Sequence, residues 1–340
     1  MKHRAFIPLV VLLILALLSG CSDNASSTPA SSGASSKPET VLEKIDVVLD
    51  WTPNTNHTGL YVAMEKGWYE EVGLNVRLVQ SVEGGALPLL ATNQAEFGIS
   101  FQEDIAMALS TSSPLPVLAV ASIIDHNLSG LISLASKGIE TPKDLEGMRY
   151  ASWDTPLEKA IINDIIAADG GDPELLVYVP NTVTDIFSAL EIDIDLVWIF
   201  RAWDGIAADV KGLDYNYLDF RELNPVFDFY TPVIAASQHF VETNPDAAKR
   251  FLAATQRGYE YACAEPEEAA NILCAYVPEL DADIVHASQI FLADQYSAEK
   301  EHWGGIDADR WTIFFNWLYE EGIISVDLGS QGFSNDYLPQ

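Results

Sequence analysis

The chain has 340 residues, of which 50 are Asp or Glu and 18 are Lys or Arg, and its formal net charge is -32 at pH 7. Because the chain has no excess of basic residues to neutralise phosphates, this composition argues against a nucleic-acid partner. We attribute the acidity to the solvated surface of an exported protein and not to a cation site. About 300 residues follow the N-terminal region, which is enough for one large or two medium domains.

The N-terminal region has the pattern of a secretory signal over residues 1–20. Positive residues at positions 2–4 precede an apolar run of about thirteen residues, which is too short for a comfortable membrane span of about twenty. The Leu-Ser-Gly-Cys sequence at 18–21 is typical of a bacterial lipobox, which predicts cleavage before Cys21 and attachment of lipid to its thiol. An ordinary signal peptide and an uncleaved anchor are the alternatives. Residues 21–43 are rich in Ser, Ala and Pro, which predicts a flexible tether.

Apolar runs and helical patterns alternate through the first part of the remaining chain. This order favours an α/β fold with a parallel sheet, because strands joined by crossover helices run in the same direction. The expected elements are strand 45–49, helix 59–72, strand 75–79, helix 84–92, strand 97–100, helix 104–110 and strand 117–124.

A second α/β set follows, and the chain from Pro245 onward has an almost wholly helical pattern. The return of a β-like run at 231–236 indicates that the second set is inserted into the first. The expected elements of the second set are strand 131–135, a helix start at 141–145, strand 149–152, helix 156–169, strand 176–179, helix 182–190, strand 196–199, helix 203–211 and strand 215–219.

The loop between the first strand and the first helix is the first candidate site. It lies at the carboxyl end of a strand, where ligands bind in open α/β sheets. It combines a flat aromatic (Trp51), an amide (Asn54) and an imidazole (His57), and Tyr61 follows in the helix. We predict that these four residues contact a ligand; a helix-capping loop with one buried Trp is the alternative.

Three further clusters each follow a predicted strand, at 101–104, 152–156 and 198–205. Together with Trp51 they bring several aromatic planes and polar groups toward one cleft. A flat heteroaromatic ligand fits between such planes, with amides and carboxylates contacting its ring edge. Core packing is the alternative for each Trp. The side chains assigned to ligand binding in these clusters are Gln102, Glu103, Trp153, Trp198, Trp203 and Asp204.

The opening pattern Asp-Trp-x-Pro-Asn-x-x-His-x-Gly-x-Tyr-x-Ala at 50–63 resembles the thiamine-pyrimidine-precursor group of the periplasmic binding-protein superfamily. Shorter motifs at 67–69, 95–99 and 141–147 extend the resemblance over nearly the whole mature chain. The resemblance implies a two-lobed, type II periplasmic-binding-protein fold, each lobe a mainly parallel sheet flanked by helices. Lobe I would comprise 44–130 and 231–340, and lobe II 131–230.

The same resemblance implies the function. The protein would be the solute-binding component of an ABC importer, held on the extracytoplasmic face of the cell membrane by its N-terminal lipid. It would work as a monomer with a permease and an ATPase, and bind a formylaminopyrimidine-like precursor. Riboflavin is a serious alternative ligand, because the cluster at 198–205 departs from the pattern of the formylaminopyrimidine binders. Sulfonates, nitrate and taurine rank lower, because only Arg201 supplies a cation in these loops.

No catalytic residue, cofactor or metal motif is expected. The sequence has no G-x-S-x-G, no P-loop and no histidine cluster with metal spacing. This superfamily includes the fungal pyrimidine synthase, which has a cofactor-anchoring Lys and a self-consumed His. We align these two residues with Ser100 and Asp104 of this sequence. The cysteine-rich iron motif of the synthase is absent from this sequence. A sensor relative is a further alternative. Cys263 and Cys274 are expected to be free, largely buried thiols.

Overall fold

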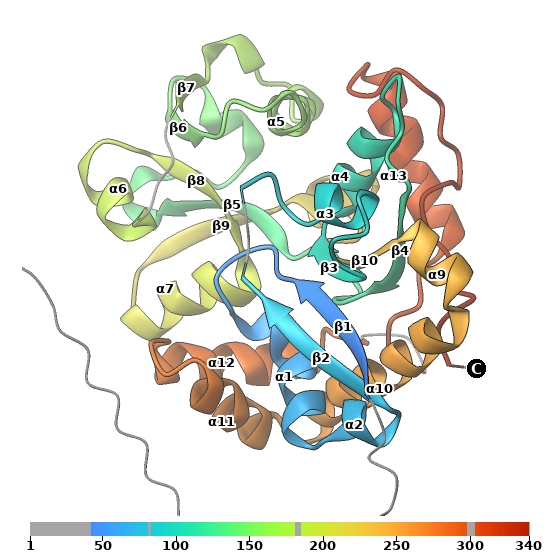
Figure 1. Ribbon diagram of the computed structural model, residues 1–340. Helices are drawn as coiled ribbons and strands as arrows, with labels where there is room; N and C mark the ends of the chain where they lie inside the picture. The colour runs from blue at the N-terminus through green and yellow to red at the C-terminus, as the bar shows by residue number, and fades with distance from the viewer. Residues whose placement is uncertain (1–41, 81–82, 181–184, 298–302, 340) are drawn as a thin grey trace, which may run out of the picture. The chain divides into compact units, whose positions relative to one another are not determined.

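The computed structural model describes residues 42–80, 83–180, 185–297 and 303–339. The predicted signal peptide, Cys21 and nearly all of the predicted tether lie outside the described residues. Within these ranges the chain forms two five-stranded sheets flanked by helices (Figure 1). The expected α/β class is confirmed.

The first sheet has the strand order β2-β1-β3-β10-β4. Strand β1 pairs in parallel with β2 and β3, whereas β10 runs antiparallel to β3 and β4, so four of the five strands share a direction. β1 is buried on both faces from Ile45 onward because helices cover both sides of the sheet, which explains why its apolar residues do not alternate with exposed ones. Asp46, the one polar residue of this run, is buried and paired with Arg77. The strands of the first sheet are β1 (Glu43–Val48), β2 (Leu74–Val79), β3 (Phe97–Ser100), β4 (Val117–Ser122) and β10 (Val233–Ser237).

The second sheet repeats this plan with the order β7-β6-β8-β5-β9. Here β6 pairs in parallel with β7 and β8, and β5 is the strand that runs against its neighbours. Its strands are β5 (Ser129–Leu134), β6 (Arg149–Ser152), β7 (Val177–Pro180), β8 (Leu196–Phe200) and β9 (Tyr215–Asp219).

The helices between the strands follow the predicted order, with three local differences. The helix start expected at 141–145 forms only a 3₁₀ turn at Pro142–Leu145. The helix expected at 59–72 divides at Gly67, whose positive φ of 69° ends the first helix. The helix expected at 203–211 begins with a π-helical turn at Arg201–Gly205. These helices are α1 (Thr58–Glu65), α2 (Trp68–Glu71), α3 (Leu87–Ala91), α4 (Gln102–Leu109), α5 (Pro156–Ala168), α6 (Ile186–Ile192), α7 (Ile206–Lys211) and α8 (Phe220–Leu223).

The C-terminal region is helical, as the sequence predicts. α10 packs closely on α1: a Cβ added to Gly258 would lie 2.0 Å from the carbonyl oxygen of Gly59. Helix α10 ends just before Pro266, yet Cys263 and Cys274 are free thiols, as expected, although they are only partly buried. The helices are α9 (Gln238–Thr243), α10 (Pro245–Ala264), α11 (Pro266–Tyr276), α12 (Ala282–Ala293) and α13 (Ala308–Glu320).

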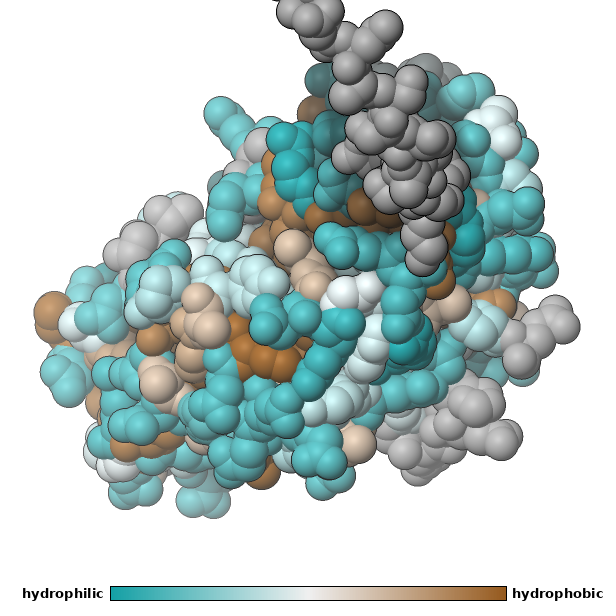
Figure 2. All heavy atoms as spheres, turned by 60° about the horizontal axis from the view of Figure 1, so that its bottom comes forward, coloured by the Kyte–Doolittle hydropathy of each residue, from teal (hydrophilic) through white to brown (hydrophobic). Residues whose placement is uncertain are grey.

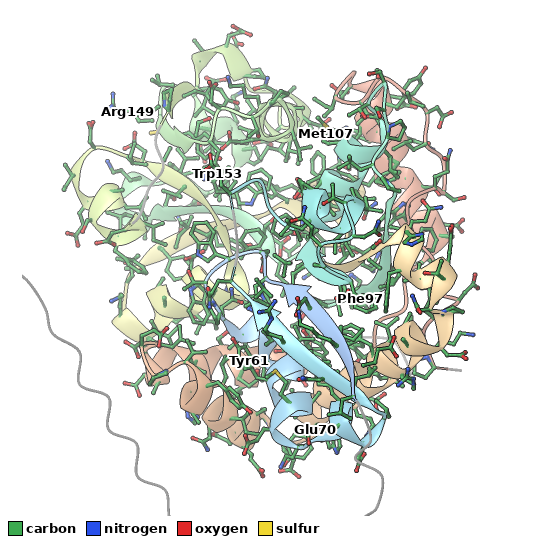
Figure 3. The ribbon with its side chains drawn as sticks, in the orientation of Figure 1. Tyr61, Glu70, Phe97, Met107, Arg149 and Trp153 are labelled. Carbon is green, nitrogen blue, oxygen red and sulfur yellow. The ribbon has the colours of Figure 1, made fainter. Side chains whose placement is uncertain are left out.

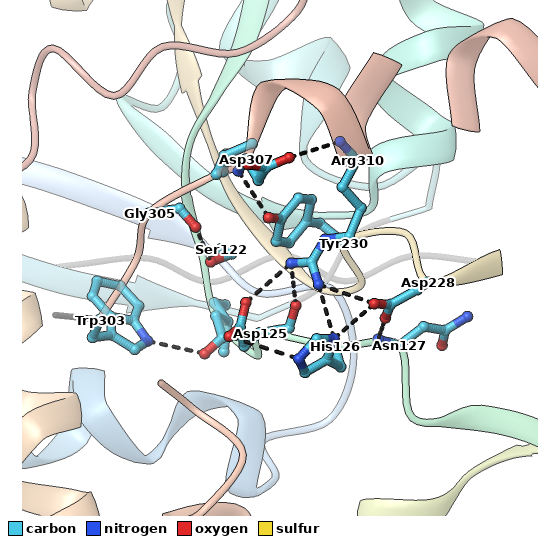
Figure 4. Close-up of polar contacts among 12 residues, drawn as sticks. Ser122, Asp125, His126, Asn127, Asp228, Tyr230, Trp303, Gly305, Asp307 and Arg310 are labelled. Carbon is cyan, nitrogen blue, oxygen red and sulfur yellow. Dashed lines mark hydrogen bonds and ion pairs between the residues drawn. The ribbon is translucent and has the colours of Figure 1, made fainter. Parts of the chain in front are cut away.

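The chain crosses from the first sheet to the second between β4 and β5, and returns between β9 and β10. β5, the first strand of the second sheet, begins at Ser129, two residues before residue 131, where lobe II was predicted to begin. Polar side chains tie the two crossings together (Figure 4). His126 Nδ1 lies 2.7 Å from Asp228 Oδ2, and Arg310 of α13 lies 3.0 Å from both the Asp125 and the Asp228 carboxylates.

The surface agrees with the acidic composition. On the face shown in Figure 2, hydrophilic residues form most of the described surface, and apolar residues interrupt it in smaller areas. A helix that is long and apolar enough to span a bilayer is absent from the described residues.

Candidate functional site

A cavity of about 250 Å³ lies at the carboxyl ends of β1 and β3 in the first sheet. This is the edge at which open α/β sheets bind ligands, because the connecting loops diverge there. Two carboxylates, Asp50 and Asp104, belong to its lining, and the remaining lining residues are apolar or glycine apart from Ser100. None of the described residues that line it is basic, so the cavity favours a ligand that donates hydrogen bonds. The lining residues are Asp50, Gly84, Gly85, Ala86, Leu87, Pro88, Ile99, Ser100, Phe101, Asp104 and Leu115.

Asp50 is held in place by the loop that follows it. The backbone N–H of Asn54 donates to His57 Nδ1 over 3.2 Å, so this ring nitrogen carries no proton. The proton therefore sits on Nε2, which lies 2.7 Å from Asp50 Oδ1 and donates to it. His57 is completely buried, and the Asn54 side chain caps the short helix at 55–57. We conclude that His57 and Asn54 orient Asp50, and that the carboxylate is the group presented to the cavity.

Trp51, unlike the buried His57, is exposed to solvent. It follows Asp50 directly and is 71% exposed, although a Trp ring is among the costliest side chains to leave in water. The alternative of a buried, core-packing Trp at this position is wrong. The structure thus leaves the Trp51 ring uncovered, although Trp51 is not among the residues that line the cavity.

A second exposed aromatic lies at the end of β6 in the second sheet. Trp153 is 48% exposed, and its ring centroid is 5.7 Å from that of the buried Trp198 on β8 (Figure 3). Trp198 packs in turn against Phe220, with centroids 4.4 Å apart. The two Trp residues predicted in separate clusters are therefore neighbours, and one supports the other.

Asp204 lies in the π-helical turn after β8. Such turns are rare and occur often at functional sites. Burial raises the pKa of Asp204 to about 6, and the backbone N–H of Phe200 donates to its carboxylate over a long 3.4 Å. Trp203 beside it is only partly buried and packs against the apolar cluster below the first sheet. Asp204 is thus a carboxylate poised to change charge near neutral pH.

Glu103 is the second carboxyl group with a strongly perturbed pKa. Burial, and to a smaller extent the negative charge of Asp104, raises the pKa of Glu103 to about 8. One of its carboxyl oxygens is fully buried without a hydrogen-bond partner. At neutral pH this group is mostly protonated, so it is able to donate a hydrogen bond as well as accept one.

Gln102 and Tyr61 make internal contacts and do not line the cavity. The Gln102 side chain is fully buried; it donates to the Trp311 carbonyl over 3.0 Å and accepts from the Tyr230 N–H over 2.8 Å. The Tyr61 ring lies 5.3 Å from that of Tyr276 among the helices below the first sheet (Figure 3), and burial raises its pKa to about 12. We therefore leave both residues out of the ligand contacts proposed below.

Asp50, Ser100 and Asp104 line the cavity, although they are not among the residues predicted from the sequence to bind the ligand. A signal for Asp50 was present: it is an acidic residue directly after the apolar run of β1. Within the described ranges, no three His, Cys, Asp or Glu side chains are grouped so that they would hold a metal ion.

The comparison with solved structures identifies the fold. It is the fold of the periplasmic binding proteins, as the expected two-sheet arrangement implied. Among solved structures, the periplasmic aliphatic sulphonate binding protein SsuA from Escherichia coli is similar with a TM-score of 0.67 and 14% sequence identity, over 86% of this chain and 92% of that chain. At this identity the likeness concerns the fold alone.

The particular family follows from the sequence comparisons. The family model described as "NMT1/THI5 like" matches residues 54–269, and the chain belongs to this family. The formylaminopyrimidine-binding protein of Halalkalibacterium halodurans is 28% identical over 338 residues, which cover 93% of each chain. The 4-amino-5-hydroxymethyl-2-methylpyrimidine phosphate synthase of Legionella pneumophila is 26% identical over 247 residues, covering 70% of this chain and 75% of that protein. These matches confirm the resemblance stated from the opening motif.

Proposed function

We propose that this protein is the extracytoplasmic solute-binding component of an ABC importer and that its ligand is an aminopyrimidine of the formylaminopyrimidine type. The observation that carries the proposal is the cavity at the edge of the first sheet, which two carboxylates and no basic side chain line among the described residues. Trp51, which follows Asp50 in the chain, is exposed and free to cover a ligand ring. The similarity to a formylaminopyrimidine-binding protein over nearly the whole chain supports the same ligand class.

The chemistry of the site fits such a ring. An aminopyrimidine has an exocyclic amine that donates and ring nitrogens that accept. The Asp50 carboxylate, fixed by His57, accepts from the amine, and Trp51 covers one face of the ring. An anion such as a sulfonate would need cationic donors. Arg201, the cation that the sequence offers in these loops, is instead paired with Asp209 at 2.6 Å.

The family also contains a synthase, so an enzymatic role is the alternative to transport. The cofactor-anchoring Lys and the self-consumed His of the synthase align with Ser100 and Asp104 of this chain. Both positions line the cavity, but neither side chain is able to anchor a cofactor as an imine or act as the self-consumed imidazole. This difference supports a binding role.

Transport requires capture and release. We propose that the two sheets close on the ligand by bending at the crossings 123–128 and 220–232, with the ligand favouring the closed state through its contacts to both. Asp204, Trp153, Trp198 and Trp203 would be the contacts from the second sheet, and Glu103 an additional contact from the first. Cys21 would carry the lipid that keeps the protein at the membrane.

The experiment that tests this proposal is mass spectrometry of the small molecule released when the purified protein is denatured. We expect an aminopyrimidine in stoichiometric amount from the wild type and much less from Asp50→Asn. Asp309→Asn, on an exposed position of α13 that does not line the cavity, is the matched control and should retain the ligand. Release of riboflavin or of an aliphatic sulfonate in stoichiometric amount would contradict the proposed ligand.

A further inference from the structure

One buried carboxylate, in the helix that follows β6 of the second sheet, has no role among the contacts described above. Glu158 is only 2% exposed, although it is an ionisable residue, and it lies in the first turn of α5. Its backbone N–H donates to the Thr155 hydroxyl, which caps the helix, over 3.2 Å. A carboxylate in this position is stabilised by the helix dipole, so its burial does not require a cationic partner.

The Glu158 side chain accepts three hydrogen bonds from the end of β6. Its Oε1 accepts from the Tyr150 hydroxyl and, over 3.1 Å, from the backbone N–H of Trp153. Its Oε2 accepts from the Ser152 hydroxyl over 2.8 Å. A Glu at this helix position commonly returns to the backbone N–H of the capping residue. Here it reaches two residues further back, and it thereby fixes the backbone of Trp153.

The next residue completes the support of the Trp153 backbone. Asp154 has a positive φ of 60°, which is uncommon for a residue other than glycine, and its N–H donates to Ser152 Oγ over 2.9 Å. The backbone on both sides of Trp153 is therefore held by hydrogen bonds, while the indole ring itself is half exposed. Rigid backbone support under an exposed aromatic ring is expected where the ring must meet a ligand.

Trp198 provides an independent indication that a ligand binds here. Its side chain is more than nine-tenths buried, and its indole N–H has no hydrogen-bond partner. A buried donor without a partner costs about 1–3 kcal/mol, so buried donors in proteins are nearly always paired. Trp153 lies against this ring with an interplanar angle of 48°. The two rings form a corner that offers an aromatic face and one unused donor.

We propose that Glu158 is a positioning residue of the ligand site: it holds Trp153 in the orientation that forms this corner with Trp198. The corner receives the face of a ring ligand, and the Trp198 N–H donates to an acceptor atom of that ring. The inference rests on the proposed function, because it assumes that a heteroaromatic ligand binds between the sheets. Glu158 itself acts only through Trp153.

The test follows the Trp153 ring and the affinity separately. The protein is labelled with 5-fluorotryptophan, and the ¹⁹F resonance of Trp153 is assigned with Trp153→Phe. In Glu158→Ala, without ligand, we expect this resonance to shift or broaden while the other indole resonances stay in place. Calorimetry with formylaminopyrimidine should show an affinity about tenfold weaker, since a misplaced ring loses about 1.4 kcal/mol of stacking.

Glu158→Gln is the conservative variant. Its amide oxygen still accepts from the Trp153 N–H, and its amide nitrogen is able to donate to Ser152 Oγ, so both the resonance and the affinity should stay close to wild type. An unmoved Trp153 resonance in Glu158→Ala would overturn the proposal, as would unchanged affinity. Collapse of all the indole resonances in both variants would overturn it too, because Glu158 would then serve the fold alone. Failure of the wild type to bind any aminopyrimidine contradicts the proposed function, whereas the ligand-free resonance tests the positioning by Glu158 on its own.

Discussion

Replacement of Trp51 by Ala separates a ligand-binding role of this side chain from a structural one. Covering a whole Trp side chain removes on the order of 200 Å² from water. Trp51 is 71% exposed, and a stacked ring covers one of its two faces, so about 70 Å² should be buried by the ligand. At about 25 cal/mol per Å² this corresponds to about 2 kcal/mol, or about thirtyfold in affinity.

The assay is calorimetric titration of wild type and Trp51→Ala with formylaminopyrimidine, together with thermal unfolding of both proteins. Melting temperatures should agree, because removal of an exposed side chain changes stability little. Tyr319→Ala is the matched control: Tyr319 is an exposed aromatic on α13 that does not line the cavity, and its loss should leave the affinity unchanged. Unchanged affinity in Trp51→Ala, with a large fall in melting temperature, would refute the reasoning.

Three further predictions concern carboxylates and the anchor. Asp204→Asn should weaken binding of the aminopyrimidine by about 1–3 kcal/mol at pH 7.5, the range of a charge-assisted hydrogen bond. Because burial raises the pKa of Asp204 to about 6, wild-type affinity should fall as the pH is lowered through 6, and calorimetry should find no such fall in the variant. Glu103→Gln should stabilise the protein at pH 8.5 and have little effect at pH 4. The pKa of Glu103 is about 8 in the folded protein and about 4.5 in the unfolded chain, so the wild type loses stability as the pH rises from about 4.5 to 8. Thermal unfolding at the two pH values checks this, and an equal effect at both would contradict it. Cys21→Ser should move the protein from the membrane fraction to the soluble fraction or leave the precursor uncleaved, and membrane retention of a cleaved, unlipidated form would contradict the lipid anchor.

The order of strands and helices was predictable because each element carries its own periodicity. Predominantly apolar runs such as 45–49 predict strands that are buried on both faces, and the structure places them in the sheets. The helix boundaries in the structure differ from the predicted ones where one residue decides the backbone conformation, as at Gly67, or where the helix begins with a π-helical turn, as at 201–205.

The candidate site was harder to predict, because side-chain contacts depend on distant parts of the chain. Gln102 looked like a cleft residue in the loop after a strand, yet its amide is bonded to the carbonyl of Trp311, 209 residues later. His57 looked like a ligand contact, and its ring instead fixes Asp50 seven residues earlier. No local pattern distinguishes a His that faces a ligand from one that orients a neighbour.

For Trp51 the structure excludes the core-packing alternative, and contact with a ligand stays a prediction. A Trp between a strand end and a turn-forming Pro has few neighbours to cover it, and the structure leaves it exposed. Burial of Glu158 was not visible in the sequence, because two of its three donors lie in β6 and the third directly after it, and only the folded β6–α5 connection brings them together.

The proposed function depends most directly on the chemical class of the ligand. We would titrate the purified wild-type protein in a calorimeter with formylaminopyrimidine, riboflavin and an aliphatic sulfonate under the same conditions at pH 7.5. The acidic lining of the cavity and the exposed Trp51 predict that formylaminopyrimidine binds most tightly and that the sulfonate gives no measurable heat. Tighter binding of the sulfonate than of either ring compound would contradict the account.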